Sequence, residues 1–217
     1  MCAYKYSIHW SFLYILLNHI FINNPADKGQ RIVCAFWAYG TEMAHLVVKV
    51  IERCENATET SHLDLSQCEL MQIPDAVYHL MRNTILQTCN LSGNVLKKLT
   101  PKFAMKFSAI TDLNLSYNQL SKLPDELANL SALTTLNISH NSFITLPQVV
   151  FKLQKLATLD AQQNAILEID TDEAVSSDSL ALVDLRNNPL SRNCRRKLQD
   201  YKTSFRLEIS SDVEDDW

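Results

Sequence analysis

A short and regular repeat dominates this chain of 217 residues. A cysteine or asparagine recurs at intervals of 26, 24, 23, 23 and 24 residues, at Cys68, Asn94, Asn118, Asn141, Asn164 and Asn188. Each of these positions has an apolar residue two places after it and another three places before it. A fixed period of 20 to 50 residues is the signature of a repeat architecture, in which units stack to bury a shared core. The chain is therefore expected to fold as a solenoid.

The clearest unit runs from Ile110 to Leu130 and reads I-x-x-L-x-L-x-x-N-x-L-x-x-L-P-x-x-L-x-x-L. Its L-x-L pair alternates with a period of two, which predicts a short strand with apolar side chains inward and the intervening ones outward. The asparagine is expected to close the following turn, where its amide can satisfy unpaired backbone groups. Proline follows at a fixed offset in three units and fixes φ where the chain enters its helical arc.

The repeat predicts an α/β solenoid of about six units, with a curved parallel sheet on the concave face and short helices or 3₁₀ turns on the convex face. We expect an N-terminal capping helix over residues 43–60, six repeats over 61–191 and a C-terminal cap over 192–207. Residues 208–217 form an acidic tail. Residues 1–42 fit this scheme poorly and are predicted to be an extension that is disordered or leader-like.

The N-terminal segment leaves one alternative open. The apolar stretch from Ile8 to Ile22 is short for a membrane span but loosely resembles a secretory signal peptide. The chain could then be a secreted or membrane-tethered recognition ectodomain, with residues 1–26 as signal or anchor. Five glycosylation sequons have little weight here, because those at Asn90, Asn114 and Asn137 are produced by the repeat itself.

The six cysteines are scattered, at Cys2, Cys34, Cys54, Cys68, Cys89 and Cys194. They form neither a CxxC pair nor a Cys/His group at zinc spacing, and Cys68 and Cys89 occupy core positions of the repeat. This distribution is typical of a protein in a reducing compartment, so we expect a cytoplasmic location.

The outward strand residues would line the concave face, which is the usual binding surface of a curved solenoid. Most of them are amides, serines and carboxylates, and the aromatic-type residues near the middle are Tyr117 and His140. Aromatic side chains surrounded by polar groups are common anchors of protein interfaces. The candidate contact residues are Tyr117, His140, Asp64, Asn114, Asn137, Asp160, Asp184 and Arg186.

Other functional classes find no support in the residues. The net charge of −4 and the pI near 5.8 argue against a general nucleic-acid binder. The chain has no G-x-S-x-G, P-loop, H-E-x-x-H or dinucleotide fingerprint, so we expect neither an enzyme nor a bound cofactor or metal. The expected partner is another protein, and nucleic acid and membrane are not expected partners.

Three segments show a resemblance to a known family: residues 62–70, residues 96–103 and residues 185–190. In the second of these the proline stands one place late, at Pro101, which matches an irregular second repeat. From Met43 to about Leu207 the chain resembles the short, repeat-only intracellular leucine-rich-repeat proteins of animals. The resemblance implies a repeat solenoid, and it supplies no catalytic residues.

Overall fold

A computed structural model describes residues 45–169, 179–200 and 205–210. Residues 1–42, with the apolar stretch and Cys2 and Cys34, lie outside the described part of the chain. The chain divides into two compact units. The first contains the residues up to Asp64 together with Ile73–Thr84, and the second contains Leu65–Gln72 and the chain from Ile85 onward.

The first unit holds a helix over residues 45–60, strand β1 (His62–Asp64) and helix α3 (Asp75–Leu80). The helix buries one apolar stripe with the three- and four-residue spacing of an amphipathic helix, and β1 and α3 bury their own apolar residues. The residues buried in this unit include Val47, Val50, Cys54, Ala57, Leu63, Ala76, Val77, Tyr78 and Met81.

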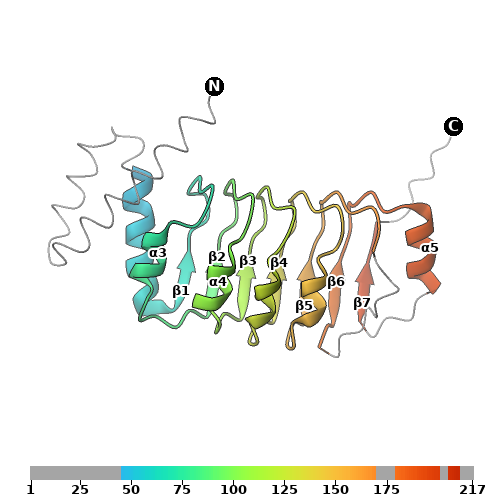
Figure 1. The fold of residues 1–217 in the computed structure, drawn as a ribbon. Helices are drawn as coiled ribbons and strands as arrows, with labels where there is room; N and C mark the ends of the chain where they lie inside the picture. The colour runs from blue at the N-terminus through green and yellow to red at the C-terminus, as the bar shows by residue number, and fades with distance from the viewer. Residues whose placement is uncertain (1–44, 170–178, 201–204, 211–217) are drawn as a thin grey trace, which may run out of the picture. The chain divides into compact units, whose positions relative to one another are not determined.

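The second unit is built on parallel strands that follow one another in chain order (Figure 1). They are β2 (Thr88–Asn90), β3 (Asp112–Asn114), β4 (Thr135–Asn137), β5 (Thr158–Asp160), β6 (Leu182–Asp184) and β7 (Arg206–Glu208). Equivalent repeat positions face each other across the sheet, so that Leu113 pairs with Leu136 and Asn114 with Asn137. The central residue of each strand from β2 to β5 is buried and its two neighbours are half-buried, as the alternation predicts.

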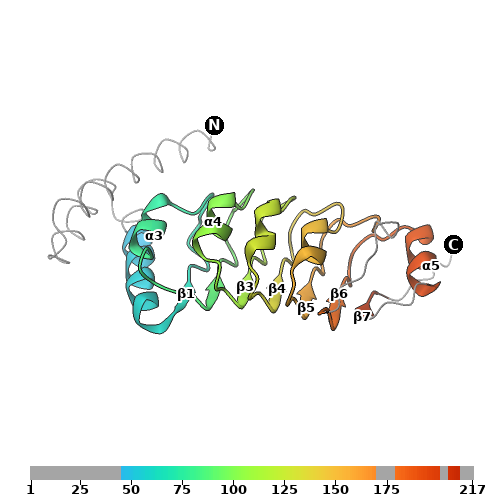
Figure 2. The ribbon, with the colours of Figure 1, turned by 60° about the horizontal axis from the view of Figure 1, so that its bottom comes forward.

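Short helical segments lie on the other side of this sheet (Figure 2). They are α4 (Pro101–Lys106), the 3₁₀ helices η1 (Asp125–Asn129) and η2 (Gln148–Lys152), and, at the C-terminal end, α5 (Arg192–Asp200). Proline precedes η1 and η2 in extended conformation and is the first residue of α4, where its missing N–H leaves no hydrogen bond unmade. The predicted fold class is confirmed.

The turn asparagines form the predicted ladder between successive repeats. Asn118 shows the pattern: its Oδ1 accepts a hydrogen bond from the N–H of Leu96 (3.0 Å) in the preceding repeat. Its Nδ2 donates to the carbonyls of Leu91 (2.9 Å), Leu115 (3.1 Å) and Ser116 (3.1 Å). One side chain therefore satisfies backbone groups of two repeats, and equivalent bonds are made by Asn94, Asn141, Asn164 and Asn188.

The C-terminal end differs from the expected plan in one respect. The residues after α5 add a parallel strand, β7, whose Leu207 pairs with Val183 of β6. The expected boundary between the cap and the acidic tail, at residues 207 and 208, falls inside this strand. Glu208 is therefore a residue of the sheet, and its carbonyl accepts a hydrogen bond from the N–H of Leu185 (2.8 Å).

Candidate functional site on the strand face

The strand face is defined here as the face of the β2–β7 sheet turned away from α4, η1 and η2, which corresponds to the expected concave face. From β2 to β5 each repeat places four positions on this side of the sheet, the first and third strand residues and two residues of the following turn, although Ser116 and Ser139 among them are buried. These positions are Thr88, Asn90, Ser92 and Gly93; Asp112, Asn114, Ser116 and Tyr117; Thr135, Asn137, Ser139 and His140; and Thr158, Asp160, Gln162 and Gln163.

The third strand residues share a local hydrogen bond. The side-chain oxygen of Asn114 accepts from the N–H of Ser116 (2.9 Å), two residues further on. Asn90, Asn137, Asp160 and Asp184 accept in the same way from residues 92, 139, 162 and 186. This side-chain turn holds the backbone as it leaves the strand. Much of the polar character of these candidates is thus explained by local structure.

The last outward position of each repeat has a left-handed backbone. Its φ is 54° at Tyr117, 52° at His140, 50° at Gln163 and 66° at Gly93. This region disfavours residues with a Cβ, and strain of this kind clusters at functional sites. The conformation is imposed by the repeat, because the N–H groups here bond to the next turn: that of Tyr117 donates to the carbonyl of Ser139 at 3.1 Å.

Tyr117 and His140 stack on each other at these two positions. Their ring centroids are 3.8 Å apart and the ring planes differ by 14°. Tyr117 is nevertheless 58% exposed. On the side away from His140 stands Gly93 of the preceding repeat, which has no side chain of its own and is approached by the side chain of Gln67. The sequence predicted these two residues as contact candidates, and the structure brings them together as one aromatic platform.

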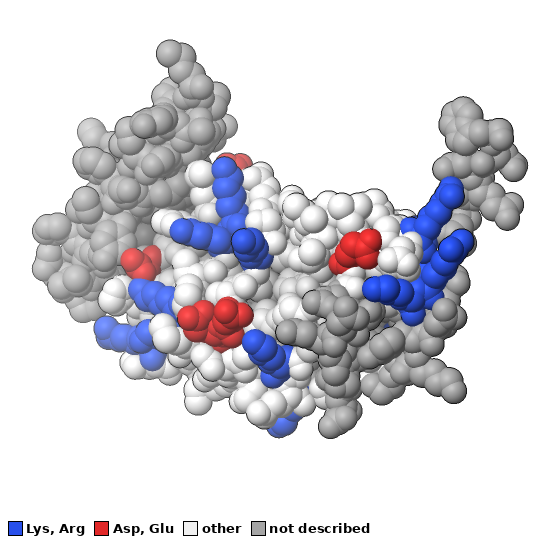
Figure 3. All heavy atoms as spheres, turned by 45° about the vertical axis from the view of Figure 1, so that its right-hand side comes forward, with Lys and Arg blue, Asp and Glu red and all other residues white. Residues whose placement is uncertain are grey.

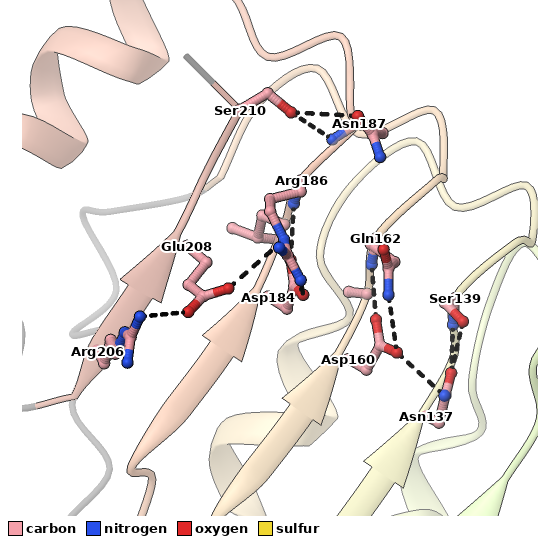
Figure 4. A network of polar contacts seen from close by, with 12 residues as sticks. Asn137, Ser139, Asp160, Gln162, Asp184, Arg186, Asn187, Arg206, Glu208 and Ser210 are labelled. Atoms are coloured by element: carbon pink, nitrogen blue, oxygen red, sulfur yellow. Dashed lines mark hydrogen bonds and ion pairs between the residues drawn. The ribbon is translucent and has the colours of Figure 1, made fainter.

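A charged network covers the C-terminal part of the strand face (Figure 4). Arg186 donates to both carboxylate oxygens of Asp184, with an Nη2–Oδ2 distance of 2.6 Å, and its Nε lies 3.5 Å from Oε2 of Glu208. Arg206 pairs with the other oxygen of Glu208 at 2.8 Å. These carboxylates thus have cationic partners within the same sheet, and Asp184 itself is only 7% exposed.

The pair also shifts the protonation equilibria. Burial by itself would raise the pKa of Asp184, but the hydrogen bonds and the positive charge of Arg186 outweigh it and hold that pKa below its usual range. The hydrogen bond from Arg186 to Asp184 and the carboxylate charge raise the pKa of Arg186. Asp184 therefore remains ionised at neutral pH and serves chiefly to hold Arg186.

Two carboxylates nearer the aromatic platform have a different environment. Asp112 accepts a hydrogen bond from the hydroxyl of Thr111 (2.6 Å), and Asp160 accepts from Nδ2 of Asn137 (3.0 Å) and Nε2 of Gln162 (3.2 Å). Within the described part of the chain, neither has a lysine or arginine at ion-pair distance. The charge of Arg186 nevertheless acts on Asp160 at longer range.

Asp64, the remaining carboxylate among the candidates, belongs to the first unit. Its Oδ1 lies 3.8 Å from Nη1 of Arg53, and its side chain is 55% exposed. The pair spans the 45–60 helix and β1 of that unit. Asp64 is therefore not a residue of the strand face, which belongs to the second unit.

The described ranges contain no group of three or more His, Cys, Asp or Glu that could hold a metal ion. A small apolar cavity lies between the last repeats, α5 and β7, where Leu146, Val183 and Phe205 are among its lining residues. Basic side chains gather at the α5 end (Figure 3), where Arg195 donates to the carbonyls of Leu190 (3.2 Å) and Ser210 (2.8 Å). These hydrogen bonds of Arg195 connect α5 to residue 210, at the end of the described chain.

Some residues of the strand face were not among the sequence candidates. Asp112 could have been found, because the alternation that places Asn114 outward places the residue two before it on the same face. Glu208 and Arg206 carried no such signal, because the stretch around them lacks the repeat pattern.

Comparison with known proteins identifies the class of this solenoid. The leucine rich repeat family model matches residues 84–143 and 131–190. A curated protein of Mus musculus, leucine-rich repeat-containing protein 20, is 46% identical over 158 residues, which are 72% of this chain and 85% of that protein. The chain therefore belongs to the leucine-rich repeat family, and the resemblance drawn from the sequence is confirmed.

Two further similarities agree with this assignment. Leucine-rich repeat-containing protein 20 of Homo sapiens is 37% identical over 93 residues, which are 42% of this chain and 50% of that protein. A solved leucine-rich-repeat protein of Leptospira interrogans superposes with a TM-score of 0.57 at 22% identity. That match covers 76% of this chain and 40% of the solved one, and it supports the fold alone.

Proposed function

We propose that this protein is an interaction module, an adaptor or regulatory subunit, that binds a partner protein through its strand face. Membership of the leucine-rich repeat family favours protein binding in general. The observation that carries the proposal is the stacked pair of Tyr117 and His140. An aromatic pair in which Tyr117 is 58% exposed and which is surrounded by polar groups has the character of an interface hot spot.

The backbone beneath this platform supports the same function. Tyr117 and His140 each donate their N–H to the neighbouring turn. The ladder asparagines Asn118 and Asn141 stabilise the same turns by donating hydrogen bonds to backbone carbonyls. A surface held in this way loses little conformational entropy on binding. Affinity can therefore come from a few contacts on a preformed surface.

Affinity capture with matched variants tests the proposal. Tyr117→Asn removes the platform while keeping a residue that tolerates positive φ. Met105→Gln removes an apolar side chain of similar exposure, 63%, from α4 on the opposite side of the sheet. Proteins captured by the wild type should be lost with Tyr117→Asn and retained with Met105→Gln. The reverse pattern would place binding on the helical side and contradict the proposal.

We also propose a cytoplasmic location. Cys54, Cys68, Cys89 and Cys194 are buried and form no disulfide among the described residues, as expected for thiols used as small apolar core residues. Among the described helices, none has the length and apolar character needed to cross a bilayer. The alternative of a secreted ectodomain can be tested at the exposed sequon Asn56, where a glycosidase-sensitive mass in protein from animal cells would contradict a cytoplasmic location.

A further inference from the structure

We propose that the strand face recognises a basic segment of its partner, with an arginine guanidinium stacked on the open face of Tyr117. The inference rests on the proposed protein-binding function and names the chemistry of the partner. Three observations carry it: the geometry of the platform, the charge of the surrounding face and the separate neutralisation of the C-terminal end.

The platform has one covered and one open side. His140 stacks on one face of the Tyr117 ring at 3.8 Å. On the other side stands Gly93, whose N–H bonds to the carbonyl of Ser116 (3.0 Å) and which offers no side chain. The side chain of Gln67 leans over Gly93, since a Cβ at Gly93 would lie 3.1 Å from Cγ of Gln67. Tyr117 is still 58% exposed beside Gln67, so a flat group can reach the ring, and a planar guanidinium is well suited to stack there.

The charge around the platform selects a cation over a neutral aromatic group. None of the sixteen positions from β2 to β5 on this side of the sheet is lysine or arginine. The acidic residues among them are Asp112 and Asp160; among the described residues neither has a lysine or arginine at ion-pair distance, although the charge of Arg186 also acts on Asp160. This part of the face thus presents two carboxylates outside ion pairs and an aromatic ring, which complements a basic segment.

In the C-terminal part of the strand face, arginine side chains of the same sheet neutralise the carboxylates. Asp184 and Glu208 are held by Arg186 and Arg206 across β6 and β7. Asp160, on the neighbouring strand β5, has no arginine at ion-pair distance within the described residues and interacts with Arg186 only at longer range. Asp112 and Asp160, on β3 and β5, therefore carry the least neutralised charge of this face.

The spacing suits a short extended segment. Tyr117 follows Asp112 by five residues, at most about 16 Å along the chain, and β3 and β5 are two strand spacings apart, about 10 Å. An extended peptide rises about 3.3 Å per residue, so roughly five residues span from the platform to either carboxylate. One arginine on Tyr117 and further cations at Asp112 and Asp160 can belong to the same segment.

Peptide selection on the full chain tests the proposal. A library of random twelve-residue peptides would be selected in parallel on immobilised wild type and on Tyr117→Asn. We expect arginine to be enriched on the wild type only. In a synthetic peptide from this pool, replacing the key arginine by neutral citrulline should weaken binding at least threefold, because the cation–π and ionic contacts are lost together.

Charge variants complete the design. Asp112→Asn and Asp160→Asn should each weaken the selected peptide about twofold or more and reduce the salt dependence of its binding. Asp125→Asn, which removes an exposed carboxylate from η1 on the other side, should leave binding unchanged. Peptides that need Tyr117 but show no arginine enrichment, or that tolerate citrulline, would overturn the inference and leave the proposed function standing. The inference is also overturned if the wild type selects no arginine-containing peptide. Peptides that bind the wild type and Tyr117→Asn equally well would count against both this inference and the proposed function.

Discussion

The ring of Tyr117 lies parallel to that of His140, with 3.8 Å between centroids, although the two residues are one full repeat apart in the chain. The contact exists because equivalent positions of successive repeats stand side by side. Both residues adopt a positive φ that is uncommon for residues with a Cβ. The platform is therefore built on a backbone that asparagine or glycine would accept more readily.

Tyr117→Asn should change the free energy of unfolding by less than about 1 kcal/mol. The variant loses a stacking contact worth about 0.5–1.5 kcal/mol, and it relieves left-handed strain of about 1–2 kcal/mol. Urea unfolding measures the balance. Gln163→Asn, at the equivalent position with φ of 50°, is the matched control without a stack. A loss above about 2 kcal/mol at Tyr117 alone would show that the ring is needed for folding.

Asn118→Ala should destabilise the protein by about 1–3 kcal/mol, because it leaves buried backbone groups of two repeats without partners. Asn114→Ala is the control, since its side chain is half-buried and accepts from the single N–H of Ser116. It should cost under about 1 kcal/mol. Chemical denaturation measures both variants. Equal shifts of the denaturation midpoint for Asn118→Ala and Asn114→Ala would contradict the stabilising role of the asparagine ladder.

Gly93→Ala should destabilise by about 1 kcal/mol, because φ is 66° and the new Cβ would lie 3.1 Å from Cγ of Gln67. The same substitution in a Gln67→Ala background separates backbone strain from crowding. If backbone strain at Gly93 dominates, thermal unfolding shows that the effects of Gly93→Ala and Gln67→Ala on stability are nearly additive. A strongly non-additive effect of the two substitutions would show that crowding against the Gln67 side chain causes the destabilisation instead.

Asp184 should contribute to the acid sensitivity of the fold. Its folded pKa lies below the usual range, so its stabilising contribution is present at neutral pH and is lost as pH falls below about 4 toward the folded pKa. Asp184→Asn should lower stability at pH 7 and flatten the pH dependence between about pH 4 and 2. Unfolding curves across that range measure this, with Asp125→Asn as the exposed control. An unchanged acid slope would show that the Arg186 pair does not shape this transition.

Deleting residues 1–42 should leave the thermal midpoint of the repeat domain nearly unchanged, because the segment was predicted to lie outside the folded repeats. Differential scanning calorimetry of the deletion variant and the full chain gives the comparison. A drop of more than several degrees would mean that this segment stabilises the solenoid.

The candidate site was only partly accessible to sequence reasoning. The alternation around each L-x-L pair placed Asn114, Asn137 and Asp160 outward, and the structure places them there. It did not reveal that Asp184 is nearly buried beneath Arg186, because burial depends on a neighbour whose side chain can fold back over it. The pairing of Arg186 with Glu208 was hidden as well, since β7 carries no repeat pattern.

The repeat period by itself determined the fold class, the strand positions and the asparagine ladder. These follow from local periodicity, because a unit that exposes its leucines can bury them only by stacking on its neighbours. The stack of Tyr117 on His140, the left-handed turns, the added strand β7 and the balance of charges along the face were decided by the tertiary structure. Each depends on how residues about one repeat apart meet in space. Their spacing and direction cannot be read from the sequence alone.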